Sequence, residues 1–142
     1  MKALPRELQA GEDVAPRVRA QPALAWLSVA AWMIMIFVFS ALPSVSTPLE
    51  GAYEFTLKKF AHVGEYAVLA ALLFRALQIH IKHLPRSLTF TVLTAILFAA
   101  SDEWHQTFVP GREGTLRDIG IDALGIAAVV LWLHFARRYS SR

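Results

Sequence analysis

The chain contains no cysteine among its 142 residues, which excludes both a disulfide framework and any metal site built on thiolates. Charge is scarce as well: Asp, Glu, Lys and Arg make up 18% of the residues, against 56% hydrophobic residues. With a mean hydropathy of +0.44, this composition is too apolar for an ordinary soluble domain. The few bases are spread along the chain without interleaved aromatics, so we expect no nucleic-acid binding.

The chain has four long apolar segments, which are unusual in a soluble protein. They lie at Ala23–Leu42, Phe60–Ile79, Leu88–Phe108 and Ile119–Phe135. About 20 helical residues cross the roughly 30 Å of membrane hydrocarbon, so each segment has about spanning length. The first is too long for the apolar part of a signal peptide, and mixed charges precede it, which favours an uncleaved span. The sequence therefore predicts an all-α membrane protein, a four-transmembrane-helix bundle.

The segments outside the spans complete the expected domain organisation. Residues 1–22 contain three prolines and mixed charge without apolar periodicity, which predicts a disordered cytoplasmic tail. The membrane domain is expected over residues 23–136, followed by a short cytoplasmic tail at 137–142. Between spans one and two, Leu49, Tyr53, Leu57 and Phe60 repeat at helical spacing. This pattern predicts a short interfacial helix that runs into span two.

The distribution of the 14 bases predicts the orientation of the bundle. Nine bases fall on one side of the four-span arrangement, four fall on the other, and Arg75 lies within a span. Cytoplasmic loops carry the excess of Lys and Arg, so both termini are expected in the cytoplasm. The nine are Lys2, Arg6, Arg17, Arg19, Lys82, Arg86, Arg137, Arg138 and Arg142, and the four are Lys58, Lys59, Arg112 and Arg117.

Polar residues recur at the ends of the apolar segments, and this topology places all of them at the outer membrane face. They occur at the start of span two, at the end of span three, in the loop that follows, and at the start of span four. Ionisable groups at such depth cost free energy and usually face the bundle interior. The candidate ligand-binding residues are Lys59, His62, Glu65, Tyr66, Asp102, Glu103, Gln106, Arg112, Asp118 and Asp122.

A purely structural interpretation of these residues is an ion-paired latch. In it, Arg112 or Arg117 neutralises Asp102 or Asp118, while Gly125 permits close helix packing. Thr115, three residues before Asp118, also has the form of a helix capping box in which Asp replaces the usual Glu or Gln. Under this interpretation the polar groups hold the helices together and bind nothing else.

Two functional interpretations compete with the latch. In the first, the Gly-Arg loop that opens the last helix binds an anion, aided by free backbone N–H groups, Lys59 and His62. In the second, a divalent metal is gathered by carboxylates and a histidine, namely Asp102, Glu103, Asp118, Asp122 and His62. No dense metal motif is present, and the sequence leaves the use of a metal or cofactor open.

The motifs themselves resemble the VanZ-like family, which is named for a membrane protein associated with low-level teicoplanin resistance. The resemblance covers about residues 23–135. It is carried by Lys59-x-x-His62-x-x-x-Tyr66, by Asp102-Glu103-x-x-Gln106-x-Phe108-x-Pro110-Gly111-Arg112, and by Asp118-x-x-x-Asp122-x-x-Gly125. In one departure, Asp122 stands where the family usually has Asn, which adds a possible negative charge.

The resemblance implies a small multi-pass protein of the bacterial cytoplasmic (inner) membrane, linked to glycopeptide resistance or envelope functions. The leading expectation is a cell-envelope protein that binds a polar, anionic ligand in an outward-facing site. Its partners would be membrane lipids, such as a lipid-linked cell-wall precursor or an anionic head group. The alternative is an intramembrane enzyme acting on a lipid-linked phosphate or glycan, with His62 or Glu65 as general base and with metal dependence left open.

Because the chain lacks cysteine, its orientation can be tested with single introduced cysteines. A cysteine at Ser46 should react with a membrane-impermeant thiol reagent added to intact cells, whereas a cysteine at Ser140 should react only after the cells are opened. Mass-tag labelling on a gel measures both. The reverse pattern would invert the orientation and move the polar residues to the cytoplasmic face.

Overall fold

The structure, a computed structural model, describes residues 22–43 and 51–139. The described chain forms four helices: α1 (Pro22–Ser40), α2 (Gly51–His80), α3 (Leu84–Gln106) and α4 (Leu116–Tyr139). Each contains a stretch long and apolar enough to cross a membrane. The predicted all-α four-helix bundle and its four spans are thus confirmed, with boundaries that differ from the expected ones by a few residues.

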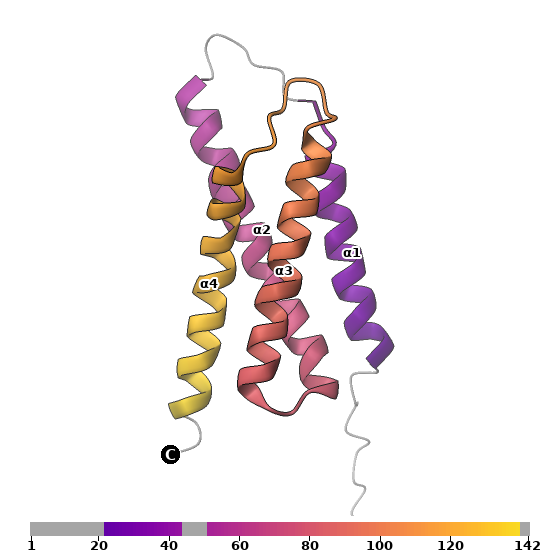
Figure 1. The fold of residues 1–142 in the computed structure, drawn as a ribbon, viewed down its shortest axis with the longest axis vertical. Coiled ribbons are helices and arrows are strands. Elements are labelled where there is room, and N and C mark those ends of the chain that lie inside the picture. Colours follow the sequence, from indigo (N-terminus) through magenta and orange to yellow (C-terminus); the bar gives the residue numbers. More distant parts are fainter. Residues whose placement is uncertain (1–21, 44–50, 140–142) are drawn as a thin grey trace, which may run out of the picture.

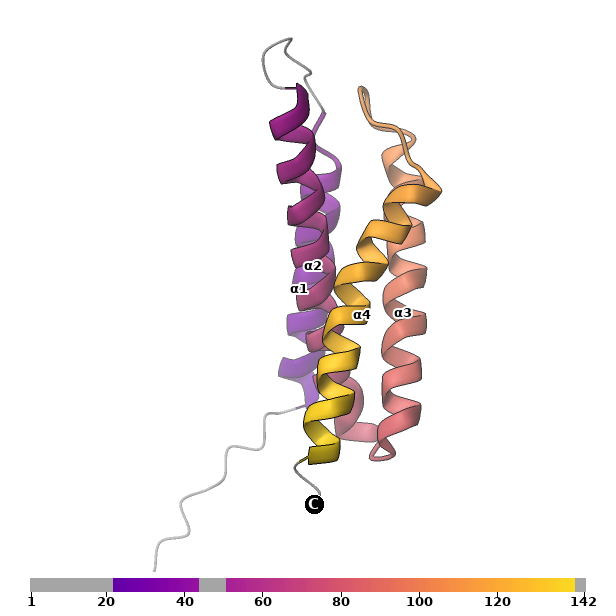
Figure 2. The same ribbon diagram turned by 90° about the vertical axis from the view of Figure 1, so that its left-hand side faces the viewer.

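The helices run up and down, with α2 at the centre of the bundle (Figures 1 and 2). Helix α2 packs against the other three helices, most extensively against α4, while α3 also contacts α4 and only briefly contacts α1. The described ends of the chain, at the start of α1 and the end of α4, lie at the same end of the bundle (Figure 1). At the opposite end, α1 and α3 finish and α2 and α4 begin; we call this the polar end.

One expected element differs in the structure. The short interfacial helix between spans one and two is not a separate element, since the chain from Gly51 onward belongs to the same 30-residue helix as span two. At 1.5 Å per residue that helix is about 45 Å long, which exceeds the hydrocarbon thickness, so its first turns extend beyond the other helices. Most of the two expected tails, and the first two residues of the expected interfacial helix, lie outside the described residues.

Local signals set the ends of α3 and thereby the position of the polar end. At its start, the ring of His83 accepts a hydrogen bond from the backbone N–H of Arg86, and Pro85 occupies the first turn, where a missing N–H costs nothing. At its other end the helix stops at Gln106, and a compact turn follows in which Gly111 has a φ of 75°. Glycine adopts this left-handed conformation without steric cost.

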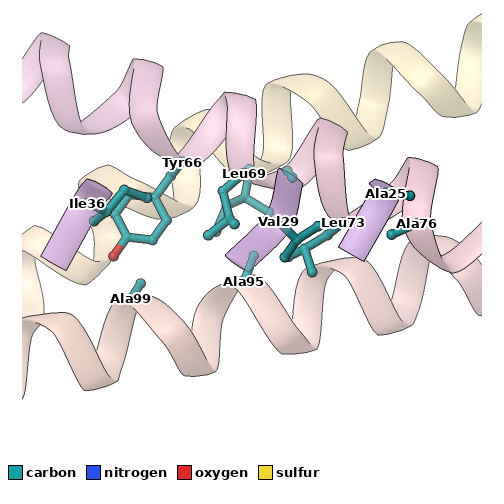
Figure 3. Packing of buried hydrophobic residues seen from close by; sticks show 11 residues of the cluster. Ala25, Val29, Ile36, Tyr66, Leu69, Leu73, Ala76, Ala95 and Ala99 are labelled. Carbon is teal, nitrogen blue, oxygen red and sulfur yellow. The ribbon is translucent and has the colours of Figure 1, made fainter. Parts of the chain in front are cut away.

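The apolar core combines five alanines with larger aliphatic residues and one tyrosine. Ala95 and Ala99 of α3 face Val29 and Ile36 of α1, with side chains of α2 between them (Figure 3). Close approach of backbones through small residues is typical of helix packing in membranes. The ring of Tyr66 fills the end of this core that is nearest the polar residues, and its hydroxyl points toward α3 (Figure 3).

The surface of the bundle is the reverse of a soluble protein's surface. Large apolar side chains are exposed on all four helices, among them Leu27, Phe60, Leu97 and Trp132. The buried residues, in contrast, include several polar and charged ones: Ser40, Ser87, Thr91, Asp102, Glu103, Gln106 and Asp122. Apolar side chains outside and polar side chains inside suit a bundle surrounded by lipid.

Gly125 sets the distance between α2 and α4. A Cβ atom at this position would overlap the backbone carbonyl of Val63, whereas a Cβ at Gly120, on the same helix, would meet nothing within 4 Å. The expected role of Gly125 in close helix packing is confirmed.

A glycine-to-alanine pair tests this contact. Gly125→Ala should lower the melting temperature in detergent, because the backbone of α2 must shift at a cost of about 1–3 kcal/mol. Gly120→Ala, the matched control, should leave it unchanged or raise it slightly, since alanine favours helix over glycine. Equal melting temperatures for the two variants would show that the α2–α4 contact tolerates separation.

Candidate functional site

The candidate residues meet at the polar end, where the four helices contribute side chains or carbonyl groups to one cluster. Helix α2 provides the residues from Lys59 to Tyr66, α3 provides Asp102, Glu103 and Gln106, and α4 provides Asp118 and Asp122. The turn after α3 brings Arg112 over them. The last turn of α1 supplies Ser40, which the sequence motifs did not include.

Asp102 lies at the centre of a hydrogen-bonded network and is fully buried. Its Oδ2 accepts hydrogen bonds from Ser40 Oγ at 2.8 Å, from Gln106 Nε2 at 3.1 Å and from the Tyr66 hydroxyl at 3.5 Å. These donors come from α1, α3 and α2, so one carboxylate oxygen connects three helices. Its other oxygen, Oδ1, has no hydrogen-bond partner among the described residues.

Glu103 joins the end of α3 to the start of α4. Its Oε2 accepts a hydrogen bond from the backbone N–H of Thr115 at 2.9 Å, and the hydroxyl of Thr115 accepts one from the N–H of Asp118 at 3.2 Å. The capping box expected within residues 115–118 is therefore half correct. Thr115 caps the helix, but the reciprocal carboxylate comes from Glu103 of another helix, which leaves the Asp118 side chain available for another contact.

Two acid–base contacts connect α2 with α4, one turn apart. Nearer the rim, Lys59 Nζ lies 2.6 Å from Asp118 Oδ1. Deeper in the bundle, His62 Nδ1 lies 3.2 Å from Asp122 Oδ1. Asp122 is fully buried, and its Oδ2 has no hydrogen-bond partner in the described part of the chain.

Arg112 does not form the ion pair that the latch interpretation expected. Its guanidinium donates to the carbonyls of Leu42 and Phe39, both at 3.0 Å, and to Gln106 Oε1 at 3.3 Å. The last carbonyls of a helix lack partners within it and carry partial negative charge, so Arg112 caps the end of α1. Within the described residues, Asp118 pairs with Lys59, and no Arg or Lys contacts Asp102.

A cavity of about 430 Å³ opens beside these contacts. Four bases and two acids line it, together with His62, Gln106, Gly111 and Thr115; the bases are Lys58, Lys59, Arg112 and Arg117, and the acids are Glu113 and Asp118. A second cavity, of about 230 Å³, lies toward α1 and shares Lys58, His62 and Arg112 with the first. Glu65 and Ser40 line only this second cavity.

The structure thus brings the ten candidate residues together at one end of the bundle, where they line one of two cavities or are buried beneath them. Lys59, His62, Gln106, Arg112 and Asp118 line the larger cavity. Glu65 reaches only the smaller one, and the remaining four, Tyr66, Asp102, Glu103 and Asp122, are buried beneath.

Residues outside the original candidate set also reach this cluster. Ser40, Lys58 and Arg117 contact or line it. The sequence signal for Ser40 was weak, because a serine within an apolar helix commonly bonds its own backbone.

Replacing Asp102 tests whether its network holds the polar end together. Asp102→Leu should lower the melting temperature strongly, because the donors of Ser40, Gln106 and Tyr66 lose their common acceptor and each unpaired buried group costs about 1–3 kcal/mol. Asp102→Asn keeps an acceptor oxygen and should cost much less. If both variants have melting temperatures close to that of the wild type, the network contributes little to stability.

Comparison with known proteins places the chain in a family. No curated protein matches it, and no solved structure matches it. A family model described as VanZ/LLP1 matches residues 25–137, a range that includes the four helices almost completely and all of the residues at the polar end. The chain therefore belongs to the VanZ/LLP1 family and is a multi-pass membrane protein.

Proposed function

We propose that this protein binds an anionic head group, such as a lipid phosphate, in the larger cavity at the polar end. The observation that supports the proposal best is the charge of the cavity wall, in which four bases outnumber two acids. A volume of about 430 Å³ falls within the usual range for small-molecule sites, about 300–1,000 Å³. The excess of positive charge in a partly buried wall favours an anion.

Arg112 is well suited to recognise a phosphate. A guanidinium has five N–H donors in a planar fork that matches phosphate oxygens. In the part of the chain that the structure describes, three of these donors bind carbonyl or amide oxygens. Those bonds fix the orientation of the group, and two donors remain for a ligand that enters the cavity beside Gly111.

The position of the cavity favours a ligand that belongs to the membrane. It lies at the end of four helices whose outer surfaces are apolar, so the head group of a surrounding lipid reaches it without leaving the bilayer. We infer that the protein acts in the cell envelope with its polar end outside, as the base asymmetry predicts. A lipid-linked cell-wall precursor would connect this site with the glycopeptide resistance for which the family is named.

A second candidate function, an intramembrane hydrolase for the same class of lipid phosphate, is favoured by one specific contact. His62 lines the cavity, and its Nδ1 lies 3.2 Å from the buried Asp122 carboxylate. A carboxylate that orients a histidine leaves its other ring nitrogen free to act as a general base. Release of inorganic phosphate from short-chain phosphatidic acid, abolished by His62→Gln, would support this function.

Binding of an anionic lipid is the direct test of the proposal. Purified protein in neutral detergent should bind short-chain phosphatidic acid but not phosphatidylcholine, measured by native mass spectrometry. Arg112→Gln should weaken binding about 10- to 100-fold, since a hydrogen bond to a charged group contributes about 1.5–3 kcal/mol. Arg75→Gln removes a base that does not line the cavity and should change nothing.

Because Arg112 also caps α1, a second variant separates binding from folding. Lys58→Gln removes a base of the cavity wall and leaves the Arg112 bonds to the end of α1 in place. It should weaken binding while lowering the melting temperature less than Arg112→Gln does. Phosphatidic acid that binds equally to wild type, Arg112→Gln and Lys58→Gln would contradict the proposed site.

A further inference from the structure

Three groups that commonly ligate metals converge from three different helices below the cavity. His62 of α2, Glu103 of α3 and Asp122 of α4 each offer one ligand atom, and these atoms all lie within 4.8 Å of one another. Glu103 is 3% exposed and Asp122 is completely buried. His62, the least buried of the three, faces the cavity, so the group has a route to solvent.

Among the described hydrogen-bond partners of the two buried carboxyl groups, only His62 can carry a positive charge. Among the described residues, the side chain of Asp122 has His62 as its hydrogen-bond partner, and its Oδ2 has none. Glu103 is bonded to a backbone N–H and, at 3.4 Å, to the amide of Gln106, both of which are uncharged. Buried charges in proteins are normally paired with an opposite charge or bound to a metal ion.

We propose that His62, Glu103 and Asp122 form a binding site for one divalent cation. A cation bound by both oxygens of Asp122 would offset both carboxylates and give the unpartnered Oδ2 a partner. Two ligand atoms bound at about 2.0–2.2 Å to one ion stand roughly 3 Å apart, and the 3.2 Å between His62 Nδ1 and Asp122 Oδ1 matches this separation. The ligand atom of Glu103 lies within 4.8 Å of the other two, so a rotation of the carboxylate about its bond to Thr115 would bring it into the same coordination sphere.

The donor set selects the kind of ion. One imidazole nitrogen with two carboxylates suits Zn²⁺ or Mn²⁺, whereas Mg²⁺ and Ca²⁺ prefer oxygen ligands throughout. The hydrogen bond from the Thr115 N–H holds the Glu103 carboxylate in position, as neighbours of metal ligands commonly do. Three protein ligands leave a coordination position open, and the cavity beside His62 is where an oxygen of an anionic ligand would fill it; this last point alone rests on the proposed function.

Metal binding can be measured without any anionic lipid. Protein stripped with a chelator, in neutral detergent and phosphate-free buffer, should bind one Zn²⁺ or Mn²⁺ per chain, counted by equilibrium dialysis and plasma mass spectrometry. Asp122→Asn and Glu103→Gln should each weaken binding by at least about 100-fold, because even loss of a residue that only supports a metal ligand costs about 10- to 100-fold. His134→Gln, which removes an imidazole near the opposite end of α4 that lines neither cavity at the polar end, should leave affinity and stoichiometry unchanged.

Two results would overturn the site. One is wild-type protein that binds no ion at about 1 mM, the weak limit of protein cation sites. The other is binding that survives in both Asp122→Asn and Glu103→Gln. Should one variant fail to fold, the other and the wild-type stoichiometry still decide. Because no phosphate is present, failure of the anion-binding proposal would leave this result unaffected.

Discussion

Three carboxylates buried between helices determine how this bundle packs, because a charge at that depth is unfavourable unless donors or cations surround it. Asp102 obtains its donors from three helices, and Glu103 obtains one from the backbone at the start of α4. Asp122 has only His62. Apart from the bond of Gln106 to Asp102, which lies within α3, these contacts join different helices, so satisfying the acids also constrains the relative positions of the helix ends. Contacts between apolar side chains in the core are less directional than these hydrogen bonds.

The charges at the polar end are distributed by depth. Four bases and two acids lie in the wall of the larger cavity, where water and ions screen them, whereas Asp102, Glu103 and Asp122 are buried below, where the dielectric constant is low. His62 and Gln106 connect the two layers, since both line the larger cavity, His62 contacts Asp122, and Gln106 bonds to Asp102 and Glu103. An anion in the cavity and a cation beneath it would stabilise each other, because each would reduce the excess charge that the other meets.

Much of this arrangement could be predicted from the sequence. The lengths of the apolar segments predicted the four helices. Because successive spans run in opposite directions, the polar motifs were also predicted to lie at one end of the bundle. Partners could not be predicted in the same way. The latch interpretation paired Arg112 or Arg117 with a carboxylate, yet Arg112 binds the carbonyls at the end of α1. No sequence motif marks helix-end carbonyls as acceptors. Ser40 was missed for a related reason: a hydroxyl becomes significant only when another helix places a carboxylate beside it.

The capping of α1 by Arg112 has a consequence for how strongly any anion can be held. An anion that approaches through the two remaining N–H donors adds its contacts to those already present. One that draws the whole guanidinium toward itself breaks the bonds from Arg112 to the carbonyls of Phe39 and Leu42, and Phe39 then keeps only the bond from the backbone N–H of Leu42. An anion that fits the existing orientation of Arg112 would gain new hydrogen bonds, whereas one that pulls the side chain away would gain them at the expense of the bonds to α1. The end of α1 would therefore limit the affinity for anions of the second kind and favour those of the first.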